Sequence, residues 1–302
     1  MNCRLVLALA AVLVAPGAAS AAEPMPVTAS FSILADLVRQ VGGKRVSVTT
    51  LVGPGGDAHV YQPTPADAKA LAASKLLVVN GLGFEGWMAR LQRSSGFKGV
   101  VVTASSGIKA QRMEEEGHGH AHGRAINDPH AWQSLANGRV YVANIRDGLV
   151  GADPEGRATY EANAGRLVAE IDALEPEVRA AIEKIPPARR KLVTSHDAFG
   201  YFATAYGLDF LAPAGVSTES EASAADVAKI IRQVKAEKIP AVFVETVSDR
   251  RLLAQIGRES GARIGGALYA DSLSAPGGPA ATYLDMFRHN VRTLTEALAP
   301  GR

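Results

Sequence analysis

Residues 53–65 read GPGGDAHVYQPTP, a polar, glycine-rich stretch with His59 near its centre. It follows a β-like run at Val46–Leu51 and precedes a helix that we expect to begin at Pro65. Strand, loop and helix in this order form the unit from which parallel sheets are built. The stretch therefore predicts an α/β fold with a lone imidazole just beyond the end of a strand, where ligands bind in open sheets.

Short apolar runs alternate with helical patterns along the rest of the chain. In the first half we expect strands at 27–30, 46–51, 76–79 and 100–103, and helices at 32–41, 65–73, 84–91 and 135–149. In the second half we expect strands at 191–195, 208–211, 241–245 and 267–270, and helices at 196–206, 223–237, 248–261 and 280–298. Residues 105–128 are expected to form a polar loop. This alternation of strands and helices in each half of the chain predicts two parallel sheets.

The longest helical pattern begins at Asp153-Pro154 and extends to Ile185. Asp at the N-cap with Pro at the first helical position is a strong start signal. A helix of ~30 residues spans ~45 Å, so we expect a rigid strut that joins two lobes. The predicted division is a signal peptide at 1–22, an N-terminal lobe at 23–152, a linking helix at 153–186 and a C-terminal lobe at 187–302.

The first 22 residues have the pattern of a secretory signal. Arg4 is followed by an apolar run from Leu5 to Ala15 and then by small residues, so cleavage is expected after Ala21 or Ala22. The run is too short for a membrane-spanning helix. The only cysteine, Cys3, precedes the run, whereas a lipid-attachment cysteine would follow it. We expect a soluble exported protein without lipid, disulfides or thiolate ligands.

Length and charge narrow the class further. The 302 residues suffice for two domains with their own cores. The formal net charge of +2 argues against a nucleic-acid partner.

Four residues are placed to meet at one site. His196 and Asp271 lie at or just beyond the ends of predicted strands, His59 lies in the loop after one, and His130 stands in NDPHAW. Each alone has an ordinary alternative, such as a loop or capping histidine or an Asx-turn aspartate. Together they are three imidazoles and one carboxylate, a set that suits Zn²⁺. Two precede and two follow the long helix, so the predicted metal site lies in the cleft between the lobes.

Other polar groups have weaker signals. His118, His120 and His122 form a flexible tract that we expect to capture metal weakly or to have no role. Glu219, Glu221 and Glu245 are candidate supporting or structural carboxylates, and His289 is expected to be structural or on the surface. Trp87 and Trp132 are expected to serve packing.

No motif in the sequence indicates catalysis. The His-Glu-x-x-His, Gly-x-Ser-x-Gly and P-loop patterns are all missing. A hydrolytic zinc site would also need an open coordination position, which four protein ligands would fill. We therefore predict metal carriage and not an enzyme.

These motifs resemble the periplasmic metal-binding proteins of ABC importers, the zinc and manganese family typified by ZnuA and TroA. The similar segments run from about Val27 to the C-terminus and include GGDAHVYQPTPAD, NDPHAW, TSHDAFGYFA, GVSTESEAS, FVETVSD and YADSLS. The resemblance implies two α/β lobes bridged by one long helix. It places the ligand positions on His59, His130, His196 and Asp271. Manganese members tend to have Glu where this chain has His196, and zinc members have a His-rich loop before the second ligand.

The function implied by the resemblance is high-affinity zinc binding for delivery to an inner-membrane ABC permease. Zinc would be the cargo and not a catalytic cofactor. The implied partners are zinc and the permease, with a periplasmic zinc chaperone as a further candidate, and the protein is expected to be a monomer. The alternatives are a secreted zinc-dependent hydrolase and a manganese-binding or adhesin-type relative.

Overall fold

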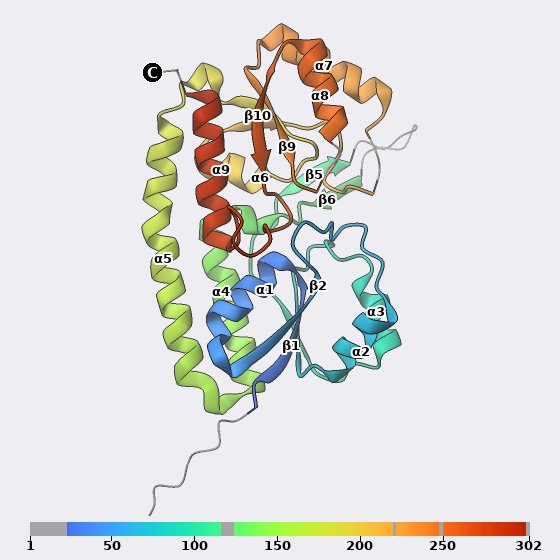
Figure 1. Ribbon diagram of the computed structural model, residues 1–302, viewed down its shortest axis with the longest axis vertical. Helices are drawn as coiled ribbons and strands as arrows, with labels where there is room; N and C mark the ends of the chain where they lie inside the picture. Colours follow the sequence, from blue (N-terminus) through green and yellow to red (C-terminus); the bar gives the residue numbers. More distant parts are fainter. Residues whose placement is uncertain (1–22, 116–123, 220–221, 248–249, 300–302) are drawn as a thin grey trace, which may run out of the picture.

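The structure is a computed structural model that describes residues 23–115, 124–219, 222–247 and 250–299. Two α/β lobes lie one above the other beside a single long helix (Figure 1). The predicted signal peptide, with Cys3, and the tract with His118, His120 and His122 fall outside the described residues.

The N-terminal lobe contains a parallel sheet in the order β2-β1-β3-β4. The strands are β1 (Met25–Phe31), β2 (Val46–Val52), β3 (Leu76–Val79) and β4 (Val100–Thr103). The central strand β1 is almost fully buried, as expected for a parallel strand covered on both faces. The helices of this lobe are α1 (Ser32–Gly42), α2 (Pro65–Ala73), α3 (Met88–Ser95) and α4 (Leu135–Ala152). A capping box between Thr64 and Asp67 starts α2 immediately after the His59 stretch.

The C-terminal lobe repeats this design with the strand order β10-β9-β7-β8. Its strands are β7 (Lys191–Val193), β8 (Asp209–Leu211), β9 (Ala241–Glu245) and β10 (Arg263–Leu268), and its helices are α6 (Gly200–Tyr206), α7 (Ala224–Glu237), α8 (Arg250–Ser260) and α9 (Tyr283–Leu298). All pairings in both sheets are parallel. The prediction of two parallel-sheet lobes is therefore confirmed.

The long helix α5 (Arg157–Glu183) follows a 3-10 turn at Pro154–Gly156 and runs beside both lobes (Figure 1). It packs against α1 and α4 of the first lobe and against α9 of the second. Its buried face consists of residues at helical spacing, which include Leu167, Ile171, Leu174, Val178 and Ile182. Asp153 is the N-cap of this turn and Pro154 its first residue, as predicted, but the carboxylate of Asp153 makes no capping hydrogen bond and instead accepts from Arg45 and Tyr160.

The segment at 105–128, expected to be a loop, contains an antiparallel pair formed by β5 (Arg112–Glu115) and β6 (Arg124–Asn127). Helices α3, α5, α6 and α9 each begin three or four residues later than predicted. Helix α3 is delayed because Glu85 accepts hydrogen bonds from the backbone of Asn80 and Gly81, which holds the preceding residues in a turn. Strand β10 ends earlier than predicted because the side chain of Asn290 bonds both the N–H and the C=O of Tyr269.

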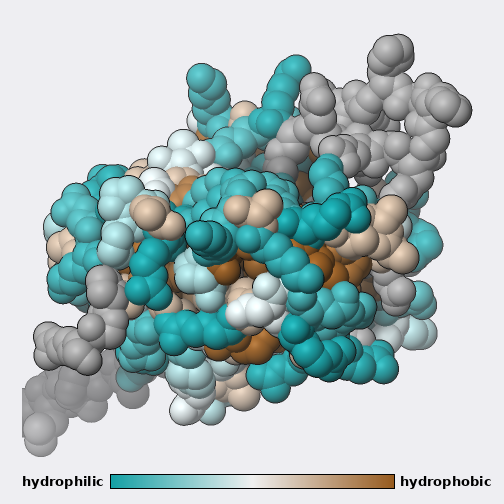
Figure 2. All heavy atoms as spheres, turned by 90° about the horizontal axis from the view of Figure 1, so that it is seen from above, coloured by the Kyte–Doolittle hydropathy of each residue, from teal (hydrophilic) through white to brown (hydrophobic). Residues whose placement is uncertain are grey.

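Seen from the end formed by α7 and α8, the surface is mainly hydrophilic, and hydrophobic atoms show between the polar side chains (Figure 2). None of the helices in the described part of the chain is long and apolar enough to span a membrane.

Candidate metal centre

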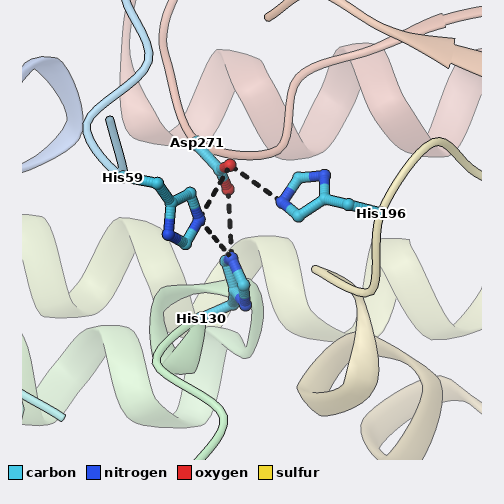
Figure 3. A group of neighbouring side chains, drawn as sticks. All are labelled: His59, His130, His196 and Asp271. Carbon is cyan, nitrogen blue, oxygen red and sulfur yellow. Dashed lines mark hydrogen bonds and ion pairs between the residues drawn. The ribbon is translucent and has the colours of Figure 1, made fainter. Parts of the chain in front are cut away.

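The structure brings His59, His130, His196 and Asp271 together between the lobes (Figure 3). His59 lies in the loop between β2 and α2, and His130 lies between β6 and α4. His196 follows β7, and Asp271 follows β10. In each case a short loop brings the side chain to the edge of a sheet or the cleft beside it, and the sequence had predicted this convergence.

The four side chains point their ligand atoms at one small volume. Nε2 of His59 lies 3.3 Å from Nε2 of His130 and 3.5 Å from Oδ2 of Asp271. Nε2 of His130 lies 3.5 Å from Oδ1 of Asp271, and Nε2 of His196 lies 3.0 Å from Oδ2. Bonds of about 2.0–2.1 Å to a tetrahedral zinc ion place its ligand atoms about 3.3–3.4 Å apart. Since one atom from each residue lies within 4.8 Å of all the others, the spacing fits a single small cation.

The chemistry of the pocket also fits a cation. His130 and Asp271 are fully buried, His196 is 1% exposed and His59 is 8% exposed. Both carboxylate oxygens of Asp271 are buried and accept no hydrogen bond from the described residues. Leaving such acceptors unsatisfied is costly, and a positive ion between these groups would satisfy them.

Two of the imidazoles each have a buried carboxylate next to their Nδ1 atom. Oδ1 of Asp128 lies 2.8 Å from Nδ1 of His130 and also accepts a hydrogen bond from the backbone N–H of that residue. Oε2 of Glu245 lies 2.5 Å from Nδ1 of His196. A carboxylate in this position keeps the proton on Nδ1 and leaves Nε2 free to bind a metal. The supporting role considered for Glu245 is thus consistent with the structure, whereas that of Asp128 was missed, although its place two residues before His130 could have indicated it.

The charges at the site are strongly coupled. Burial alone would raise the pKa of Asp271, but the facing imidazoles of His196 and His130 hold that pKa well below its usual range. Burial would likewise lower the pKa of His196, but the carboxylates of Glu245 and Asp271 raise it well above its usual value. Asp197 lies next to these groups, and burial together with the charge of Asp128 raises its pKa to about 6. A divalent cation bound among these groups would therefore displace a proton from His196.

Backbone contacts on both sides of Asp271 hold it against the N-terminal lobe. The carbonyl of Ala270 accepts hydrogen bonds from Nε1 of Trp132 and Nε2 of Gln133. The N–H of Leu273 donates to Oγ of Ser32. The last ligand thus comes from the C-terminal half of the chain but is fixed by residues of the first half.

The remaining residues that the sequence analysis singled out do not belong to the group of four proposed ligands. Trp132 is fully buried, and Trp87 donates from Nε1 to the carbonyl of Ala58 beside His59. Glu219 is exposed and lines a pocket that reaches His59. Glu221 lies outside the described residues. His289 lies on α9 and has its Nε2 next to the carbonyl of Ala267, away from the site.

Comparison with known proteins finds metal-binding proteins in each case. The family described as zinc-uptake complex component A, periplasmic, matches residues 27–297. A manganese-binding lipoprotein, MntA, of Halalkalibacterium halodurans is 35% identical over 94% of this chain and 91% of its own length. The iron-binding protein YfeA of Yersinia pestis is 33% identical over 91% of this chain and 86% of its own length. The structure of the periplasmic zinc-binding protein TroA from Treponema pallidum superposes with a TM-score of 0.85, at 30% identity, over 92% of this chain and 100% of that protein.

Proposed function

The chain belongs to the family of periplasmic zinc-uptake complex A components, and we propose that within it this protein binds zinc with high affinity and delivers it to a membrane permease. Membership identifies an extracytoplasmic metal-binding component of an ABC importer. The proposal of zinc rests on one observation, the convergence of three imidazoles and one carboxylate from His59, His130, His196 and Asp271.

The donor set is the reason for preferring zinc. Neutral imidazole is a borderline-soft ligand that suits zinc, whereas manganese(II) prefers carboxylate, carbonyl and water oxygens. Three of the four residues contribute nitrogen, and supporting carboxylates favour the neutral Nδ1–H tautomer in His130 and His196. Zinc also stands above manganese and iron(II) in the general order of affinities for such sites.

Manganese or iron(II) is the second candidate cargo, since similar proteins are named for these metals. One feature of the site favours it. Oδ1 of Asp271 faces His130 while Oδ2 faces His59 and His196, so both oxygens border the same volume. Three nitrogens and two oxygens would give five donor atoms, a number that accommodates an ion larger than tetrahedral zinc.

The remaining proposals concern catalysis, location and partners. We propose no catalytic role, because four protein ligands leave no position for a reactive water. We propose an unlipidated periplasmic protein, although relatives are named lipoproteins, since the one cysteine of the sequence is Cys3, before the apolar run. A monomer, a zinc chaperone as a further partner, and the division into lobes 23–152 and 187–302 with a linking helix at 153–186 remain proposals.

Competition titration of the metal-stripped exported protein tests the proposed cargo. Zinc, manganese and anaerobic iron(II) would each be titrated against a chelator of known affinity. We expect one zinc per chain and a zinc affinity at least 100-fold above that of manganese. Manganese or iron(II) bound as tightly as zinc would overturn the zinc assignment.

Single substitutions then test the proposed ligands. His59→Ala, His130→Ala and His196→Ala should each weaken zinc binding by orders of magnitude. His289→Ala is the matched control, because His289 lies on α9 outside the site, and it should leave the affinity unchanged. A site histidine whose removal has no effect would not be a ligand.

A further inference from the structure

The four proposed ligands differ in how firmly the protein holds them. The imidazoles of His130 and His196 each have a carboxylate at Nδ1. Asp271 is fixed by hydrogen bonds on both sides of its backbone. His59 has none of these supports for its ring, because no group in the described ranges hydrogen-bonds its Nδ1. The ring packs edge-on against Phe84 at a centroid distance of 4.6 Å, a contact without a fixed hydrogen-bond direction.

His59 is also the ligand that reaches the surface. A pocket of about 400 Å³ borders it and includes side chains of Tyr61, Trp87, Arg90 and Glu219. The pocket lies between the N-terminal lobe and the loop that contains Glu219, and none of the other three proposed ligands lines it. A metal that passes between solvent and the site by this path would meet His59 first.

The segment with His59 is tied to the opposite lobe by two hydrogen bonds. Thr218 donates from Oγ1 to Oδ2 of Asp57 at 2.6 Å, and Ser272 accepts at Oγ from the N–H of Gly55 at 2.7 Å. The other oxygen of Asp57 accepts from the backbone N–H of His59 at 2.9 Å. Thr218 therefore restrains the carboxylate that in turn positions His59.

From this asymmetry we infer that His59 is the first ligand to leave when metal is exchanged, that metal enters and leaves through the adjoining pocket, and that Thr218 controls the rate. The inference rests on the proposed function, since it requires a metal at this site. Any opening of the segment must break the bond between Thr218 and Asp57, whether metal is entering or leaving. The bond therefore acts on the barrier to exchange and has little effect on the equilibrium affinity.

Thr218→Val removes the hydroxyl donor and retains the shape of the side chain. Zinc release into an excess of a fast chelator, followed by stopped flow, gives koff, and mixing of zinc with the stripped protein gives kon. We expect both constants to rise about tenfold, the factor that corresponds to the loss of one hydrogen bond to a carboxylate. Their ratio, and therefore Kd, should change by less than about threefold.

Gly86→Leu tests the same route by narrowing it, which should slow exchange. Gly86 lines the pocket, and a Cβ at this position would meet no atom within 4 Å, so a larger side chain fits and narrows the path. We expect kon and koff to fall together while Kd is unchanged.

Two substitutions outside the pocket serve as controls. Thr295→Val removes a hydroxyl that bonds only backbone carbonyls of its own helix. Gly165→Leu adds a side chain on α5 where a Cβ also meets nothing within 4 Å. Both should leave the two rate constants as they are in the parent.

The outcomes separate this inference from the proposed function. A parent protein that binds no zinc would overturn the proposed function itself. Normal zinc affinity with unchanged rates in Thr218→Val and Gly86→Leu would overturn the inference alone. A Thr218→Val variant in which only koff rises would also overturn it, because Thr218 would then stabilise the bound state and not act on the barrier.

Discussion

Glu245→Gln is expected to weaken zinc binding far more than Asp128→Asn, although each change removes one buried charge behind an imidazole. The reason lies in the pattern of donors and acceptors. Oε1 of Glu245 accepts hydrogen bonds from the backbone N–H groups of Ser195 and His196, at 2.7 Å and 3.0 Å. Its Oε2 faces Nδ1 of His196 at 2.5 Å. Oε1 therefore accepts two hydrogen bonds and Oε2 faces a ring nitrogen, whereas an amide has only one acceptor oxygen.

In Glu245→Gln the oxygen should keep the two backbone donors, so the NH₂ group faces Nδ1 of His196. The imidazole can accept from it only by moving its proton to Nε2. That tautomer suits the metal-free protein, since Nε2 then faces Asp271 as a donor. It cannot bind zinc, because Nε2 has lost its lone pair. The substitution therefore penalises the bound state selectively.

Asp128→Asn encounters no such conflict. Oδ1 of Asp128 accepts from both Nδ1 and the backbone N–H of His130, at 2.8 Å and 2.9 Å. Its Oδ2 is buried without a hydrogen bond from any described residue, so the NH₂ group can take that position. The tautomer of His130 is preserved, and only the charge of its partner is lost.

The magnitudes follow from these bonds. A hydrogen bond to a charged group contributes about 1.5–3 kcal/mol, and each 1.4 kcal/mol is a factor of ten in Kd, so Glu245→Gln should raise Kd about 10- to 100-fold. Asp128→Asn should raise it less than about tenfold. The assay is competition titration with a zinc chelator, together with ¹⁵N NMR of the imidazoles, which reports the tautomer of His196. Equal losses in the two variants, or an unchanged tautomer in Glu245→Gln, would refute the reasoning.

Three further predictions concern zinc binding. Zinc affinity should rise with pH above 6.5, because zinc must displace a proton from His196. Burial would lower the pKa of His196, but Glu245 and Asp271 outweigh it and raise that pKa well above 6.5. Calorimetry in buffers of different ionisation enthalpy measures the released proton, and its absence would contradict this prediction. Asp271→Ala should lose less affinity than His130→Ala in a chelator titration, since three imidazoles can hold zinc with a water. Replacing His118, His120 and His122 with Asn should remove only weak additional zinc binding in equilibrium dialysis, and loss of the tight site would contradict this.

Much of the fold could be predicted because its local signals agree with its tertiary structure. Helix α2 has the predicted bounds, since Pro65 stands at its first position and Thr64 caps it. Helix α7 begins directly after Ser223, the predicted start, whose side chain caps it by accepting from the N–H of Asp226. Such capping depends on neighbouring residues in the chain and can therefore be predicted from the sequence.

Other features depend on partners that are distant in the sequence. The start of α6 moved from His196 to Gly200 because the N–H groups at residues 195 and 196 donate to Glu245, 50 and 49 residues away. The pairing of β5 with β6 was missed because the apolar pattern expected of a strand is absent there. The convergence of the four proposed ligands was predictable because parallel sheets gather loops at one edge, whereas the carboxylates behind them were not.

The position of Asp271 bears on how the proposed site reaches high affinity. Its neighbours Ala270 and Leu273 bond to Trp132, Gln133 and Ser32, all from the first half of the chain. These bonds join protein atoms, so they do not require the cation. Binding then needs little ordering of the carboxylate, and ordering is a main cost of assembling a site from distant segments. If His59 is the ligand that moves, the other three form a prearranged half-shell to which His59 adds the last metal bond, and the rate of exchange is set by the His59 segment.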